Sequence, residues 1–168
     1  MVKAGRGAHI KRVMSRAFVK EADGEPPVPE LSDRLVSTHP NLVTPSGLAR
    51  IEAEIARLHG VRDHARATDD KAALAEALRD LRYWQARHAT AQVQPAPPAG
   101  MVSFGAKVTI RRADGRKQTF RIVGEDEADP VEGTVSYVSP VARALSGKTV
   151  GDEAEVAGGA VEVVSIEV

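Results

Sequence analysis

Apolar side chains between residues 44 and 94 recur at the spacing of α-helices. The first stripe consists of Leu48, Ile51, Ile55 and Leu58. The second consists of Leu74, Leu78 and Leu81, or alternatively of Ala77, Leu81 and Trp84. Members of each stripe are three or four residues apart, which places them on one face of a helix. The polar stretch 67–70 separates the stripes, so the pattern predicts two helices of about 21 residues, each ~32 Å long, in an antiparallel hairpin.

Residues with capping chemistry mark where each helix begins. Thr44 can accept a hydrogen bond from a free backbone N–H, and Pro45 sacrifices no hydrogen bond at the first helical position. Thr68 or Asp69 can cap the second helix in the same way. We therefore expect the first helix to start after Thr44 and the second directly after the polar stretch.

From residue 101 onward the pattern changes to that of β-strands. β-Branched and aromatic residues alternate with polar ones around 102–110 and 120–123, on either side of the turn Asp114-Gly115. Further strands are expected at Val135–Tyr137 and Ala160–Val168, with a short helix at Val141–Leu145. This part predicts a small antiparallel β-sheet domain with one short helix, which makes the whole chain α+β.

Proline-rich stretches divide the chain into segments. Prolines between residues 25 and 40 interrupt regular structure, so residues 1–43 are expected to form a basic arm and a linker that is disordered or extended. The helical hairpin then occupies 44–94. A second breaker cluster at 95–100 forms a linker to the sheet domain at 101–168.

The charges balance overall but not locally. The chain has 23 basic and 23 acidic residues, which argues against a protein that coats nucleic acid. Residues 1–20 contain no acid and the bases Lys3, Arg6, Lys11, Arg12, Arg16 and Lys20. This arm is either a solvated tail or a segment that touches phosphates. The chain has no cysteine and no long apolar stretch, so we expect a cytoplasmic protein that does not interact with membranes.

The order of features between Phe104 and Val156 is distinctive. A hairpin turn is followed by an acidic loop at 124–129, a strand that ends in Ser139-Pro140, and a short helix that carries Arg143 and ends at Gly147-Lys148. This run resembles the C-terminal domain of the bacterial GreA/GreB transcript-cleavage and elongation factors. The Thr44 helix start and the exit at Ala89–Val93 are also similar to that family, so the resemblance spans 44–168.

The resemblance implies a fold and a partner. The C-terminal domain is expected to be FKBP-like and to bind core RNA polymerase at the rim of its secondary channel through Ser139, Pro140 and Arg143. The coiled coil is expected to enter the channel, where acids at its tip, here Asp69 and Asp70, help to hold a Mg²⁺ ion shared with the polymerase active site. Oxygen ligands suit this cation, which activates water for RNA cleavage. The factor itself would be a monomer without catalytic residues, in indirect contact with nucleic acid, DNA included, in the elongation complex.

Three departures from the family leave its activity open. The positions three beyond the two aspartates are Ala72 and Ala73, where an acid is expected, and Val138 stands where some relatives have an acid. The hairpin is also shorter by roughly ten residues per helix, or ~15 Å. Asp69 and Asp70 could then act merely as a helix cap and a first-turn acid. The alternative function is a non-cleaving secondary-channel regulator, similar to the regulators of nucleoside diphosphate kinase.

Two further possibilities concern the sheet domain. The FKBP-like fold suggests a peptidyl-prolyl isomerase as a distant alternative, but that activity needs a pocket with aromatic walls, and Phe104 and Phe120 occupy inward strand positions in the pattern. The acids of the 124–129 loop are either a cation site or, as is usual for an exposed loop, simply solvated. They are Glu125, Asp126, Glu127 and Asp129.

Overall fold

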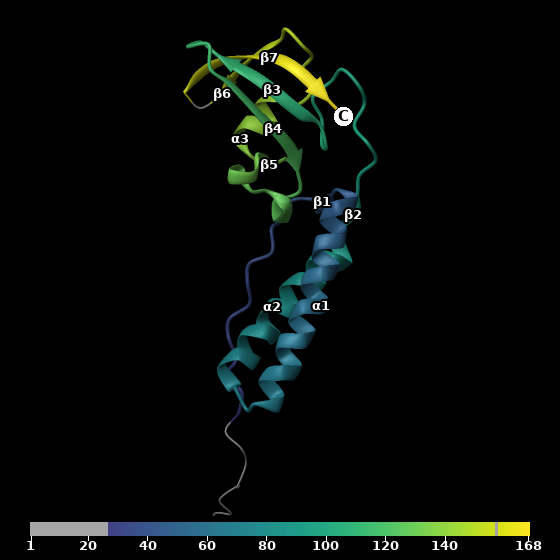
Figure 1. Ribbon diagram of the computed structural model, residues 1–168, viewed down its shortest axis with the longest axis vertical. Coiled ribbons are helices and arrows are strands. Elements are labelled where there is room, and N and C mark those ends of the chain that lie inside the picture. Colours follow the sequence, from purple (N-terminus) through teal and green to yellow (C-terminus); the bar gives the residue numbers. More distant parts are fainter. Residues whose placement is uncertain (1–26, 157) are drawn as a thin grey trace, which may run out of the picture.

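The computed structural model describes residues 27–156 and 158–168. A helical hairpin of α1 (Pro45–Ala67) and α2 (Lys71–Thr90) carries a small β-sheet domain at one end (Figure 1). The predicted helical hairpin and α+β architecture are therefore confirmed. The expectation of a disordered basic arm falls on residues 1–26, which lie outside the described part of the chain.

Each helix begins at a side-chain cap. The Thr44 hydroxyl accepts a hydrogen bond from the Gly47 N–H at 2.9 Å, and Pro45 occupies the first helical position. At α2 the cap is Asp70, whose carboxylate accepts from the Ala73 N–H at 2.9 Å. The prediction of Thr68 or Asp69 as this cap was wrong, because Asp69 adopts a left-handed conformation with φ of 53° to make the turn.

The seam between the two helices repeats every seven residues. Its fully buried members are Ile51, Leu58 and Ala65 of α1, together with Leu74, Ala77 and Leu81 of α2. A seven-residue repeat keeps one narrow stripe of each helix against its partner, as in a coiled coil. The remaining predicted members, Leu48, Ile55 and Leu78, are only partly buried.

The sheet has five strands in the order β5-β4-β3-β7-β6. They are β3 (Lys107–Arg112), β4 (Lys117–Val123), β5 (Thr134–Ser136), β6 (Glu153–Val156) and β7 (Gly159–Glu167). The sheet is mixed rather than purely antiparallel, since β4 and β5 pair in parallel. Two short 3₁₀ turns, Glu125–Glu127 and Pro130–Glu132, return the chain to a point beside Arg121 of β4, so β5 runs in the same direction along the last three residues of β4.

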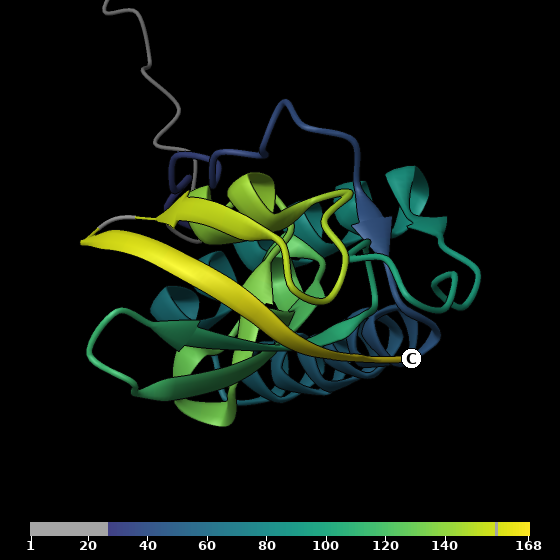
Figure 2. The ribbon, with the colours of Figure 1, turned by 90° about the horizontal axis from the view of Figure 1, so that it is seen from above.

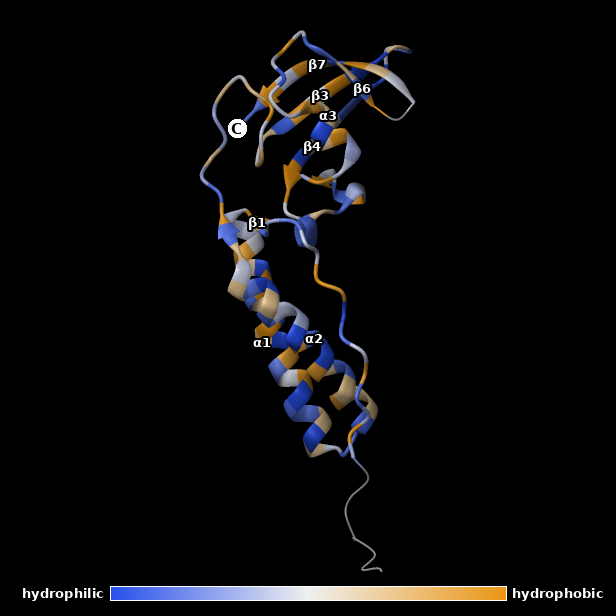
Figure 3. Ribbon diagram, turned by 180° about the vertical axis from the view of Figure 1, so that it is seen from behind, coloured by the Kyte–Doolittle hydropathy of each residue, from blue (hydrophilic) through white to orange (hydrophobic). Residues whose placement is uncertain are grey.

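The core of this domain lies between the sheet and α3 (Pro140–Leu145). Val108 and Ile110 of β3 and Phe120 and Ile122 of β4 point inward and are at most 3% exposed, as strand alternation requires. Ala142 and Leu145 cover them from α3. In Figure 3 hydrophobic residues are prominent along the strands, whereas hydrophilic residues are frequent along both helices of the hairpin. Among the described residues no helix is long and apolar enough to span a membrane.

The sequence pattern did not predict the short strand pair at the junction. β1 (Leu42–Val43) pairs in parallel with β2 (Gln92–Val93), where the chain leaves α2. Residues 27–41, called the strap below, have no helix or strand and run beside the hairpin toward its turn (Figure 1). The sheet domain lies at the end of the hairpin away from the turn, and in the view along the long axis it lies in front of the helices (Figure 2).

Candidate functional site

The first turn of α3 gathers the three residues that the sequence singled out. Ser139 is its N-cap and accepts a hydrogen bond from the Ala142 N–H at 3.3 Å. Pro140 and Arg143 are exposed and three positions apart, which places them on the same outward face of the helix. Ala142 points into the core. The structure therefore presents a rigid proline and a cation side by side at the surface.

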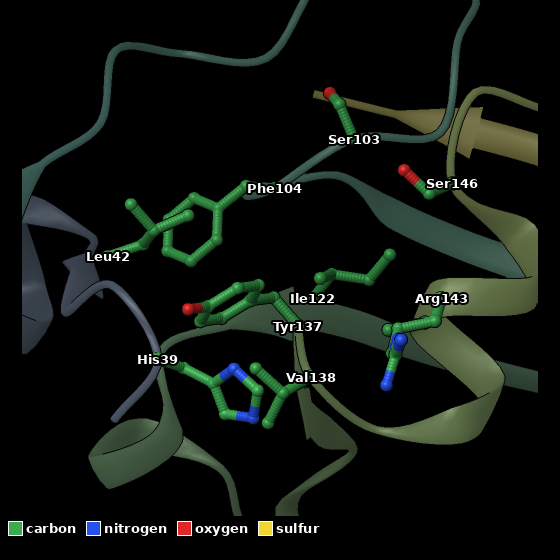
Figure 4. A pocket seen from close by; sticks show the side chains of 10 residues that line it. His39, Leu42, Ser103, Phe104, Ile122, Tyr137, Val138, Arg143 and Ser146 are labelled. Atoms are coloured by element: carbon green, nitrogen blue, oxygen red, sulfur yellow. The ribbon is translucent and has the colours of Figure 1, made fainter. Parts of the chain in front are cut away.

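Next to this face lies an apolar pocket of about 480 Å³. Its walls include Phe104, Ile122, Tyr137, Val138 and Arg143, while His39 and Leu42 close it from the N-terminal side (Figure 4). The rings of Phe104 and Tyr137 meet edge to face with centroids 5.9 Å apart. Phe104 lies outside the strands and lines the pocket, which corrects its expected inward strand position; Phe120 does face the core.

The pocket is tied to the strap by a hydrogen bond. The Tyr137 hydroxyl donates to the Pro40 carbonyl oxygen. Burial, and secondarily the negative charge of Glu125, raise the pKa of Tyr137 above its usual value. The neutral donor form of the phenol is thus the one that the site favours.

The acidic loop is a contact between the two halves of the molecule, and the expectation that it is simply solvated was wrong. Asp126 accepts a hydrogen bond from the Arg87 Nε at 2.5 Å and another from the Tyr83 hydroxyl at 2.6 Å. Arg87 is only 2% exposed, so its charge depends on this partner. Burial, followed by the hydrogen bond to Asp126, raises the pKa of Tyr83 to about 12. We call the contact of Asp126 with Arg87 and Tyr83 the latch.

A second acid of the loop anchors the start of α1. Glu127 is 6% exposed and accepts hydrogen bonds from the Thr44 N–H at 3.1 Å, from the Thr44 hydroxyl, and from the Gly124 N–H at 3.3 Å. The carboxylate lies against Gly47, where an added Cβ would be 2.1 Å from the Glu127 Cδ. Gly47 is thus required for the close approach of this carboxylate.

The sequence had pointed to Thr44 as the start of α1, and the structure adds its contact with Glu127 and the close approach of that carboxylate to Gly47. Arg87 was not selected from the sequence as functional, and Asp126 was considered only as one of four acids of a possible cation site. The two residues are 39 positions apart in the chain, so no local sequence pattern indicates that they pair.

The hairpin turn at the far end of the molecule carries Asp69 and Asp70. Both are exposed, and Asp70 already uses one carboxylate oxygen for its cap. Among the described residues no group of three or more His, Cys, Asp or Glu side chains could hold a metal ion. The two aspartates offer the oxygen ligands that Mg²⁺ prefers, but further ligands have to come from elsewhere. Because α2 has 20 residues, this turn is ~30 Å from the latch end of the hairpin.

Comparison with known proteins identifies the family. Residues 97–168 match the family described as "Transcription elongation factor, GreA/GreB, C-term". Transcription elongation factor GreA of Vibrio cholerae is 33% identical over 137 residues, which cover 81% of this chain and 85% of the relative. This chain belongs to the GreA/GreB family. GreA of Psychrobacter sp. is 38% identical over 154 residues, covering 75% of this chain and 95% of the relative.

A solved structure also resembles this GreA/GreB family member. GreA factor homolog 1 (Gfh1) of Thermus thermophilus has 17% identity and a TM-score of 0.39, with 77% of this chain and 100% of that chain covered. The sequence relatives confirm the family resemblance that was noted in the sequence. A transcription elongation factor acts on transcribing RNA polymerase, so RNA polymerase is the partner that membership in the family implies.

Proposed function

We propose that this GreA/GreB family member binds core RNA polymerase at the secondary channel, with the α3 face docking at the rim and the hairpin entering the channel. The observation that carries the proposal is the placement of the two candidate sites at opposite ends of one body. Pro140 and Arg143 are exposed beside the sheet domain, and Asp69 and Asp70 lie at the far turn (Figure 1). The latch and the Glu127 anchor join the sheet domain to the base of the hairpin, and the helices extend from there to the turn.

The α3 face has the chemistry of a docking surface. An arginine that can bind a carboxylate in a bidentate manner stands beside a rigid proline and an apolar pocket. A partner surface with an acidic side chain next to an apolar one would complement it. Val138 lines the pocket, so the wall is apolar at this position. An acid in its place would add a negative charge to this face.

Binding to purified core polymerase tests the docking face. Arg143→Glu reverses the charge without touching the core, and Ser139→Asp keeps a capping side chain while adding a negative charge. Each should weaken binding at least tenfold, and Pro140→Ala should weaken it less. The matched control is Arg116→Glu in the exposed β3–β4 turn, which should bind like the wild type. Equal affinity of the Arg143 variant and this control would refute the assignment.

We further propose that Asp69 and Asp70 contribute oxygen ligands to a Mg²⁺ ion shared with the polymerase active site. Such an ion, when bound, activates water for cleavage of RNA whose 3′ end has backtracked. This chain supplies carboxylates and their position, and the polymerase remains the catalyst. The factor acts as a monomer in the cytoplasm, and its contact with nucleic acid through this site, DNA included, is indirect.

Backtracked elongation complexes test this role. Asp69→Asn/Asp70→Asn removes both charges but retains the α2 cap, because asparagine caps as well as aspartate. The variant should lose the release of short 3′ fragments while its affinity for polymerase stays unchanged. Equal release by both proteins would show that these aspartates are not the metal ligands.

A second candidate function is the non-cleaving secondary-channel regulator. It is favoured by Ala72 and Ala73, which replace the further acid expected at the tip. The same assay separates the two functions. A wild-type protein that binds polymerase but leaves fragment release at its intrinsic rate is a non-cleaving regulator.

A further inference from the structure

The strap ends at the apolar pocket beside the α3 face and forms part of its wall. His39 lines this pocket, and Figure 4 shows its ring near Val138. The carbonyl oxygen of the next residue, Pro40, accepts the hydrogen bond from the Tyr137 hydroxyl. The strap therefore narrows the pocket and also occupies the phenol donor in its wall.

The contacts that hold the middle of the strap against α2 lie at the surface. Asp33 accepts a hydrogen bond from the Arg82 Nε at 2.6 Å, and these two side chains are 71% and 45% exposed. The Arg34 guanidinium lies 3.8 Å from the ring centroid of Tyr83 and 3.8 Å from a carboxylate oxygen of Asp80. Exposed ion pairs and cation–π contacts each stabilise weakly, and salt screens the ion pairs. The strap is thus held in one place by contacts that are easily broken.

Firm attachment of the strap begins only at Asn41. All residues of the range 27–40 are exposed or only partly buried, and this range contains no helix or strand. Asn41, by contrast, is 4% exposed, its side-chain amide donates to the Arg87 carbonyl oxygen at 2.6 Å, and its own carbonyl oxygen accepts from the Gln92 N–H at 2.8 Å. A segment with few buried contacts opens more readily than the elements beside it. Residues 27–40 can therefore detach about Asn41 while the hairpin and the sheet stay folded.

Detachment of residues 27–40 would change the pocket in two ways. It would remove His39 from the wall, and it would free the Tyr137 hydroxyl. Leu42 would stay in place, because it belongs to β1. The opened pocket would then offer an apolar floor, a phenol donor and the Arg143 guanidinium to one partner segment.

We infer that the strap is a gate on the docking face, which RNA polymerase displaces when it binds. This inference rests on the proposed docking at the α3 face. The displacing segment carries an apolar side chain for the pocket and a carboxylate for Arg143, and one of its main-chain carbonyl groups replaces that of Pro40 at the Tyr137 hydroxyl. Because the strap competes for the same site, the apparent affinity for polymerase is reduced by the fraction of molecules in which the strap is open.

A variant that releases the strap tests the gate. Arg34→Gln/Arg82→Gln removes the surface contacts and changes no residue of the pocket or of the α3 face. These contacts favour the attached strap by roughly tenfold, so the full-length variant should bind core polymerase about three- to tenfold more tightly than the wild type. The matched control is Arg111→Gln/Arg116→Gln, which removes the same charge from two exposed ion pairs of the sheet domain and should bind like the wild type.

A cross-link tests the opposite state. The chain has no cysteine, so Asp33→Cys/Arg82→Cys can be joined selectively with a reducible bismaleimide. The locked full-length protein should bind polymerase about tenfold more weakly than the wild type, and reduction of the cross-linker should restore the affinity. Arg111→Cys/Glu162→Cys is the control for the reagent. Its cross-link joins two residues that are already partners across β3 and β7, so it should leave binding unchanged.

Fluorine NMR measures the position of the strap in the free protein. The chain has two tyrosines, and each contacts the strap: Tyr83 lies beneath Arg34, and Tyr137 binds Pro40. In protein labelled with fluorotyrosine, the Tyr137 resonance should differ between the locked and the released variants, with the wild type close to the locked position. Tyr137 is the decisive reporter, because Tyr83 also senses the loss of the Arg34 charge. Tyr137→Phe assigns the signal.

Three results would overturn the inference. The first is an identical Tyr137 resonance in the locked and the released variants. The second is an equal affinity of these two variants for polymerase. The third is weaker binding by the released variant, which would show that the strap belongs to the docking surface. A wild type that binds polymerase although the lock has no effect refutes the gate alone, whereas loss of affinity in every form, the released variant included, refutes docking at the α3 face and the gate with it.

Discussion

Gly47→Ala should destabilise the protein even though alanine is the better helix former. The added methyl group would lie 2.1 Å from the Glu127 Cδ and 2.3 Å from its Oε2, well inside van der Waals contact. Glu127 is buried and the backbone of α1 is fixed by its cap, so the carboxylate has to leave its place. It then loses hydrogen bonds from Thr44 and from the Gly124 N–H.

The net effect can be estimated from these contacts. Hydrogen bonds to a charged group contribute about 1.5–3 kcal/mol each, and partial rehydration of the displaced carboxylate reduces their loss to about 2–4 kcal/mol in total. Replacing glycine by alanine within a helix recovers about 1 kcal/mol. Gly47→Ala is thus expected to lower the free energy of unfolding by about 1–3 kcal/mol.

The chain offers a matched control in the same helix. Gly60 is exposed in α1 and has no atom within 4 Å of an added Cβ, so Gly60→Ala should stabilise by up to about 1 kcal/mol. Urea unfolding followed by circular dichroism at 222 nm measures both variants, with a constant m-value as the check on the comparison. In a Glu127→Ala background the clash is absent, and Gly47→Ala should then stabilise like Gly60→Ala. Finding Gly47→Ala as stable as Gly60→Ala in the wild-type background would refute the reasoning.

Three other predictions concern the latch and the tip. Asp126→Ala leaves the buried Arg87 charge without its closest partner and should cost about 3–5 kcal/mol in urea unfolding; a loss below ~1 kcal/mol would show that water replaces the carboxylate. The pKa of Tyr83 is raised to about 12, so the folded state favours the neutral phenol. The contribution of neutral Tyr83 to the free energy of unfolding is therefore present below pH 10 and is lost as the pH rises toward 12. Absorbance titration at 295 nm should show this late ionisation in the wild type and, in Tyr83→Phe, only that of Tyr137; a wild-type midpoint at 10 for both tyrosines would contradict it. Asp70→Ala should destabilise by about 1 kcal/mol through loss of the cap, whereas Asp70→Asn should be nearly neutral, and equal losses would show that charge rather than capping matters.

The hairpin could be predicted from the sequence because its determinants are local. The apolar residues spaced three and four positions apart indicate the face on which the helices pack, although not every one of them is buried, and Thr44-Pro45 marks the start of α1. The exact cap of α2 was not predictable in the same way. Thr68, Asp69 and Asp70 all have capping side chains, and the choice depends on which residue adopts the left-handed conformation of the turn.

The strand arrangement was predictable only in part. β3, β4 and β7 contain clear alternation, but β6 (EAEV) has only four residues, two of them glutamates, and therefore gives little signal. The parallel pairing of β5 with β4 depends on the path of the chain through residues 124–133. No periodicity encodes that path.

The acidic loop shows most clearly where local reasoning fails. Four acids in a short loop are usually solvated, and within the loop nothing distinguishes Asp126 and Glu127 from Glu125 and Asp129. Their burial follows from tertiary contacts with Arg87 and Thr44. The cost of burying Glu127 and partly burying Asp126 is offset only because each carboxylate receives two or more hydrogen bonds.

Because the latch lies at the base of the hairpin, a small change in its geometry displaces the hairpin turn by a much larger distance. The hairpin is a lever of ~30 Å that is held at its base by Asp126, Arg87 and Glu127. A tilt of about 10° at the base would displace Asp69 and Asp70 by ~5 Å, whereas productive metal geometry tolerates about 0.5 Å. A change at the latch would therefore impair any metal-dependent activity at the tip well before it altered the α3 face, which moves with the sheet domain. The buried acids thus link the docking end to the tip, since they set the direction in which a docked factor points its hairpin.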